Sequence, residues 1–157
     1  MRRLVQLWLL GILLSIGGCL TSGVEEARVV QSTGNMDAVC GKKWQLVRLR
    51  INGTAIAVQG PANFTFVCNR DGNVVGRSGI NTYRGVLQVT DNGQLLWDTS
   101  SFASTKMSGP AVLLQQENTY LRALAGTRQA FTKSRGKRLI LRDVSGETYI
   151  EYVNVGP

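Results

Sequence analysis

Short segments in which apolar and polar residues alternate make up most of the chain after residue 40. In residues 63–68, Phe64, Phe66 and Cys68 fall on one face and the side chains between them on the other, the period of a strand buried on one side. Residues 43–51 are rich in β-formers, and a break in their alternation near Val47 indicates a bulge. Asn52-Gly53 follows directly and predicts a tight hairpin.

The same pattern predicts further strands on both sides of one helical segment. Apolar residues with turn signals between them mark 74–79, 85–90 and 94–97, and later 128–134, 137–143 and 147–153. Between Ser108 and Gly126 the period changes, and the apolar positions form one helical stripe: Leu113, Tyr120, Leu121 and Leu124. We expect Ser108 to cap this helix, Pro110 to lie in its first turn and Gly126 to end it.

One helix cannot cover both faces of a sheet of about eight strands. We therefore predict an α+β fold of mostly antiparallel β structure, in which the sheet curls into a partly open barrel and the helix packs on its open side.

The N-terminus has a different composition, typical of an export signal. Arg2 and Arg3 precede an apolar run from residue 4 to residue 16, which is shorter than the about 20 residues of a membrane-spanning helix. The run ends in "IGGC", the order of a bacterial lipobox, with Cys19 as the residue that receives lipid. An ordinary secretory signal that happens to contain a cysteine is the alternative.

These features divide the chain into three parts. Residues 1–18 are a lipoprotein signal peptide, 19–38 a lipidated flexible tether and 39–157 one globular domain. We expect a lipid-anchored protein of the cell envelope. Leu20 stands where an aspartate would favour retention in the inner membrane, so we expect the periplasmic face of the outer membrane.

The formal net charge is +8, and +6 once Arg2 and Arg3 are removed. Such a domain is suited to anionic lipid or an acidic envelope polymer, and export excludes nucleic acid. Basic residues concentrate in 128–142 and alternate with apolar ones at strand spacing. This segment is either the solvated face of a hairpin or an anion-binding patch. The oligomeric state does not follow from the sequence.

Of three cysteines, Cys19 is assigned to lipid, which leaves Cys40 and Cys68. In an oxidising compartment two remaining cysteines favour one disulfide, and two buried free thiols are the alternative. The bridge would close a loop of 28 residues and stabilise the domain by about 3–4 kcal/mol in the chain-entropy model.

The chain contains no histidine, which excludes Ser-His-Asp and Cys-His catalysis and imidazole ligands for zinc. The segment "SFASTK" lacks a serine three residues before its lysine, and no glycine-rich phosphate loop precedes the helix. We expect no enzymatic activity, no cofactor and no metal.

The most distinctive motif is "SGINTYRG", residues 78–85. One interpretation is structural: Gly79 and Gly85 adopt backbone angles closed to other residues, and Asn81 bonds to its own neighbouring backbone. Tyr83 would then pack against the sheet. The other interpretation is that Asn81, Tyr83 and Arg84 form a contact patch for a partner.

Five segments in order resemble the META domain family, which includes the HslJ-like heat-inducible lipoproteins. They are "KKWQLVRLRING", "GRSGINTYRG", "ASTKMSGP", "ENTYLRAL" and "KRLILRD". The resemblance spans residues 41 to about 153. It implies an antiparallel β fold with a packed helix, an envelope setting linked to stress, and no established catalysis. Family members typically carry cysteines where this chain has Ile80 and Ser108.

The sequence therefore favours a non-catalytic binding or accessory module held at the membrane by Cys19. Its partner would be an envelope protein or an anionic lipid or polymer. A pilotin-like lipoprotein that escorts a subunit of an envelope machine is one alternative, and a periplasmic chaperone-like stress factor is another.

Overall fold

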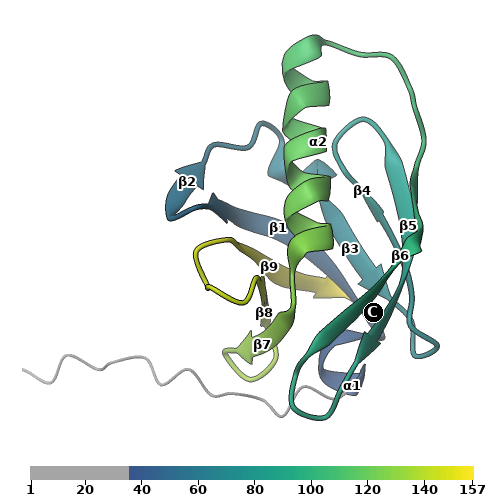
Figure 1. The fold of residues 1–157 in the computed structure, drawn as a ribbon, viewed down its shortest axis with the longest axis vertical. Coiled ribbons are helices and arrows are strands. Elements are labelled where there is room, and N and C mark those ends of the chain that lie inside the picture. The colour runs from purple at the N-terminus through teal and green to yellow at the C-terminus, as the bar shows by residue number, and fades with distance from the viewer. Residues whose placement is uncertain (1–35) are drawn as a thin grey trace, which may run out of the picture.

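The computed structural model describes residues 36–157, which form a curled antiparallel sheet with a long helix on its inner side (Figure 1). The predicted signal peptide, Cys19 and most of the predicted tether lie outside the described residues. The elements in chain order are α1 (Met36–Val39), β1 (Lys42–Ile51), β2 (Thr54–Ile56), the 3-10 turn η1 (Pro61–Asn63), β3 (Thr65–Cys68), β4 (Asn73–Arg77), β5 (Thr82–Val89), β6 (Leu95–Ser104), α2 (Ala111–Gly126), β7 (Gln129–Lys133), β8 (Arg138–Arg142) and β9 (Tyr149–Gly156).

The sheet has the strand order β6-β5-β4-β3-β1-β9-β8-β7, with β2 paired beside β1. Its two end strands meet where they begin: Gln94 bridges Gln129, and the Leu95 N–H donates to the Arg128 carbonyl at 2.8 Å. Beyond that point β6 and β7 separate. The predicted curled, partly open sheet is confirmed, with nine strands where about eight were expected.

Local sequence patterns predicted the first strands well. Phe64, Phe66 and Cys68 all lie in the core, each at most 1% exposed. The register of β1 against β9 shifts between Leu46 and Arg48, which confirms the bulge near Val47. Asn52 and Gly53 both have positive φ, 49° and 75°, as a two-residue hairpin of this kind requires.

The helix α2 stands across the inner side of the sheet (Figure 1). Tyr120 and Leu124 of the predicted stripe are fully buried, and Tyr120 meets Phe64 edge to face at 5.1 Å between ring centroids. Glu117 lies on the same stripe and is also buried, which the apolar pattern did not predict. The helix ends at Gly126 as predicted.

The predicted N-cap at Ser108 is wrong. The helix begins at Ala111 with Pro110 at the N-cap position, and the Pro110 carbonyl accepts from the Leu113 and Leu114 N–H groups at 3.0 and 3.1 Å. A cap at Ser108 would place Gly109 in the first helical turn. The residue before a proline is driven out of the helical region by contact with the proline ring, so the helix starts later.

Candidate functional site

The segment 78–85 is a turn followed by a strand. Residues 78–81 connect β4 to β5, and β5 begins at Thr82. Asn81 is 4% exposed and Tyr83 3% exposed, whereas Arg84 points outward. Of the three residues considered for a partner contact, only Arg84 is at the surface. The other two are covered because the turn lies beneath α2 and the strand turns Tyr83 inward.

Glu117 of α2 holds this turn. Its Oε1 accepts from the Ser78 hydroxyl and, at 3.1 Å, from the Asn81 backbone N–H, and its Oε2 accepts from Asn81 Nδ2 at 2.7 Å. The Asn81 side-chain oxygen accepts from Thr105 Oγ1 and the Met107 N–H, both at 2.7 Å. The Asn81 side chain therefore joins the helix to the chain after β6, rather than bonding to its own neighbouring backbone.

A signal for Glu117 was present in the sequence. It lies four residues after Leu113 and three before Tyr120, inside the apolar stripe. A carboxylate at such a position must be hydrogen-bonded by other parts of the chain, because an unpaired buried charge is very costly.

Three tyrosine hydroxyls form a buried chain next to this turn. Tyr83 donates to the Thr65 carbonyl at 2.9 Å and lies 3.2 Å from the Tyr120 hydroxyl, which lies 2.9 Å from that of Tyr152. Burial raises the pKa of Tyr120 to about 12, and raises the pKa of Tyr83 and Tyr152 well above 10.0. The three phenols are neutral at physiological pH, and their hydroxyl groups hydrogen-bond to one another and to the backbone within the core.

The glycines around Tyr83 have different roles. Gly79 has φ 109°, as expected for a turn glycine. Gly85, which was expected to need such an angle too, has ordinary strand geometry, and a side chain there would meet the Phe102 ring at 3.0 Å. A side chain at Gly76 would overlap both the Thr65 carbonyl and the Tyr83 ring. Gly76 is therefore required by the inward position of Tyr83.

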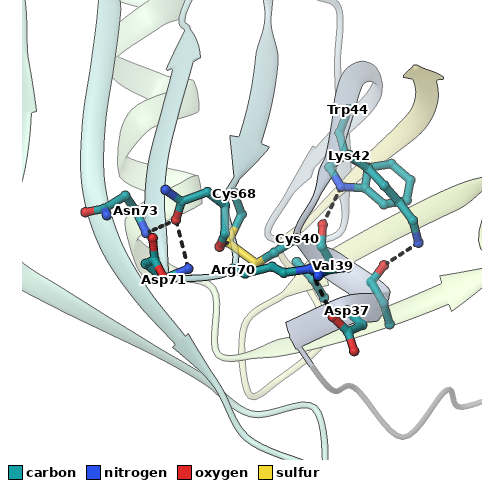
Figure 2. The surroundings of a disulfide bond; sticks show 11 residues. Asp37, Val39, Cys40, Lys42, Trp44, Cys68, Arg70, Asp71 and Asn73 are labelled. Atoms are coloured by element: carbon teal, nitrogen blue, oxygen red, sulfur yellow. Dashed lines mark hydrogen bonds and ion pairs between the residues drawn. A yellow bond between two sulfur atoms is a disulfide. The ribbon is translucent and has the colours of Figure 1, made fainter. Parts of the chain in front are cut away.

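The predicted disulfide is present between Cys40 and Cys68 (Figure 2). Cys40 directly follows α1 and Cys68 is the last residue of β3, and both are buried. The bond therefore attaches the first described helix to the sheet.

Side chains of β1 reinforce this attachment (Figure 2). Trp44 Nε1 donates to the Val39 carbonyl at 2.7 Å, and Lys42 Nζ donates to the Ala38 carbonyl at 3.1 Å. Residues 36–38, which the sequence assigned to the end of the tether, thus form a helical turn held against the domain.

Neither helix within 36–157 has the length and apolar character needed to cross a bilayer. Over the same range, no group of three or more histidine, cysteine, aspartate or glutamate residues is placed to hold a metal ion.

The family model of the META domain matches residues 37–154. The chain belongs to the META domain family. An NMR structure of a protein from Burkholderia xenovorans is similar, with a TM-score of 0.65 and 21% identity over 79% of this chain and 88% of that one. The crystal structure of a DUF4847 family protein from Bacteroides vulgatus gives a TM-score of 0.56 at 16% identity, over 75% and 95%. These likenesses concern the fold. A search of curated protein sequences found no match.

The META domain of this chain lacks the two cysteines that the resemblance implies at positions 80 and 108. The Ile80 side chain lies directly against Gly109, the neighbour of Ser108. Apolar packing therefore occupies the place where these two segments of the META domain meet.

The basic residues of segment 128–142 do not form one continuous patch, because the fold places them in three different settings. Arg128 donates to the carbonyls of Ala125 and Thr127 at 2.8 and 2.7 Å, so it caps the end of α2. Arg135 lies in the turn between β7 and β8 with φ 56°. Lys133, Arg138 and Arg142 instead alternate with the buried residues of β7 and β8, so they lie on the outer face of the META domain sheet, opposite the core.

Proposed function

We propose that this protein is a lipid-anchored cell-envelope protein whose META domain is a non-catalytic binding or accessory module. Cys19 carries the lipid after removal of residues 1–18, and the domain lies on the periplasmic side of the outer membrane. Family resemblance adds a link to envelope stress.

The Cys40–Cys68 bond is the observation that carries this proposal. Disulfides persist in the periplasm and outside the cell and are rare in the cytosol. The bond therefore supports export independently of the N-terminal signal. It also joins the end of α1, the first described helix, to β3 of the sheet.

The buried polar groups support the absence of catalysis. Glu117 is occupied by Ser78 and Asn81, and the three buried tyrosines bind one another or the backbone. A general base or nucleophile must reach its substrate within hydrogen-bonding distance. These groups are enclosed in the core and already have partners.

Metabolic labelling with a fatty-acid analogue tests the anchor. We expect the wild-type chain to incorporate the label and to fractionate with the outer membrane, and Cys19→Ala to lose the label. Cys40→Ser/Cys68→Ser is the matched control, because it removes two cysteines and should keep the label. An unlabelled wild-type chain would show that Cys19 is not lipidated.

The position of Leu20 gives a second test. Leu20→Asp should move the labelled protein from the outer to the inner membrane. A labelled protein that fractionates with the inner membrane in both forms would contradict the outer-membrane assignment.

Crosslinking in intact cells tests the accessory role. One stoichiometric partner subunit of an envelope machine would favour the assembly alternative, and many unfolded clients the chaperone alternative. Recovery of no protein, lipid or polymer adduct would contradict a binding module.

A further inference from the structure

We propose that the outer face of strands β7, β8, β9 and β1 binds the anionic phosphate headgroups of a membrane surface. We call this surface the cationic face. It consists of seven residues from these four strands: Arg48, Arg50, Phe131, Lys133, Arg138, Arg142 and Tyr149. The inference deepens the proposed function, on which it rests for the presence of a nearby membrane, by naming the chemistry that the domain recognises.

The strand register places these residues in adjacent rows. Lys133 stands opposite Arg138, and Phe131 stands opposite Ile140. Ile140 in turn stands opposite Glu151, which is opposite Arg48. The third row runs from Gln129 through Arg142 and Tyr149 to Arg50. Neighbouring strands are about 4.8 Å apart, so four strands spread these groups over roughly 15 Å.

Positive charge on this face exceeds negative charge. The Glu151 carboxylate forms ion pairs with two of these arginines, at 3.0 Å from Arg138 and 3.9 Å from Arg48. The Glu151 side chain is 13% exposed, whereas those of Arg138 and Arg48 are 41% and 59% exposed. The carboxylate lies beneath the guanidinium groups and leaves their outer N–H donors accessible.

Two further arginines are held by contacts that do not cancel their charge. Arg142 donates to Gln129 Oε1 at 2.8 Å and lies over the Phe131 ring, 4.2 Å from its centroid. Arg50 donates to the Gly53 carbonyl at 2.7 Å and lies 6.0 Å from the Tyr149 ring centroid. Stacked guanidinium groups are oriented in advance, and their planar donor sets match phosphate oxygens.

The mixture of residues favours a lipid surface over a soluble acidic polymer. Phe131, Ile140 and Tyr149 are half-buried among the cations. Aromatic rings beside arginine and lysine are typical of surfaces that lie at a membrane–water interface, where rings meet the headgroup region and cations meet phosphate.

The proposed lipid anchor would keep the cationic face within reach of the bilayer surface. The described chain starts at Met36, and α1 contacts β7, one strand of the cationic face. The segment between Cys19 and Met36 reaches at most about 60 Å when extended, which allows the face to turn toward the bilayer. Tethering also raises the local concentration of headgroups, so weak individual contacts suffice.

Vesicle co-sedimentation tests the inference with the chain from residue 20, which keeps every described residue and carries no lipid. The result is therefore independent of whether Cys19 is modified. Vesicles of phosphatidylglycerol with phosphatidylcholine are compared with pure phosphatidylcholine. We expect binding only to the first, decreasing as salt rises because ions screen exposed charges.

Lys133→Gln/Arg138→Gln/Arg142→Gln should reduce the partition coefficient on the order of 100-fold, at about fivefold per cation. The matched control, Arg70→Gln/Arg84→Gln/Arg122→Gln, removes three exposed cations elsewhere and should reduce it less than fivefold. If the first triple variant fails to fold, Lys133→Gln alone should still weaken binding about fivefold.

Three outcomes would overturn the inference. One is the absence of phosphatidylglycerol binding by the wild-type chain. Another is an equal loss in the two triple variants, which would indicate net charge alone. The third is capture by soluble dextran sulfate without binding to vesicles, which would indicate an acidic polymer.

Discussion

Asn81 binds both carboxylate oxygens of Glu117, one through its backbone N–H and the other through its side-chain amide. The two residues lie 36 positions apart, in the turn after β4 and in the middle of α2. Their contact joins the helix to the turn between β4 and β5. The motif "SGIN" thus supplies the hydrogen-bond donors, from Ser78 and Asn81, that hold α2 through Glu117.

Glu117→Ala should lower the free energy of unfolding by about 3 kcal/mol or more, because it leaves the donors of Ser78 and Asn81 buried without an acceptor. Chemical denaturation measures this. Glu117→Gln should cost less, because one oxygen is retained. Gln115→Ala, at an exposed position of the same helix, should change stability by less than about 0.5 kcal/mol. Equal midpoints for Glu117→Ala and Gln115→Ala would contradict the role assigned to Glu117.

The Cys40–Cys68 bond closes a loop with a sequence separation of 28 residues. Cys40→Ser/Cys68→Ser should therefore lose about 3–4 kcal/mol of unfolding free energy. The wild-type chain treated with reductant should approach the stability of the variant, and the variant itself should not respond to reductant. Alkylation under non-reducing, denaturing conditions should find neither thiol free; labelling of both would refute the bridge.

The buried tyrosines predict a loss of stability at high pH. Burial raises the pKa of Tyr120 from 10.0 to about 12. Below pH 10 the phenol is neutral in both states and the contribution is constant. Between pH 10 and 12 the unfolded chain releases the proton and the folded chain retains it, so stability falls, by roughly 2–3 kcal/mol from Tyr120.

Denaturation midpoints measured from pH 8 to pH 11.5 test this dependence. Tyr120→Phe should be less stable at pH 8, because it breaks the hydroxyl contacts with Tyr83 and Tyr152, but should lose less between pH 10 and 11.5. Parallel curves for the two proteins would rule out the contribution from Tyr120.

Two glycine substitutions should act in opposite directions. Gly76→Ala should destabilise the domain by about 2–3 kcal/mol, because its Cβ would overlap the Thr65 carbonyl and the Tyr83 ring. Gly126→Ala places a Cβ in open space at the last helical residue, and should raise stability by up to about 1 kcal/mol. Thermal melts of both variants measure the difference, and a neutral Gly76→Ala would show that Tyr83 can move aside.

Much of the fold followed from the sequence because it depends on neighbouring residues. Alternation placed Phe64, Phe66 and Cys68 in the core, and Asn52-Gly53 specified a hairpin through the backbone angles that these two residues accept. The single helix among many strands implied a curled sheet. The disulfide was favoured over two free thiols because two cysteines remained after Cys19 was assigned and the expected compartment is oxidising.

Tertiary structure decided which residues from distant segments of the chain contact one another. The burial of Asn81 and Tyr83 depends on α2 covering one end of β5, and no local pattern specifies which helix residue arrives there. The cationic face brings β7 and β8 beside β1, which lies about 90 residues earlier in the chain. Strand β9 makes this connection because it pairs with β8 on one side and with β1 on the other. Local periodicity sets which side of a strand is apolar. The register between strands, set by the packing of the whole core, determines which outward side chains become neighbours.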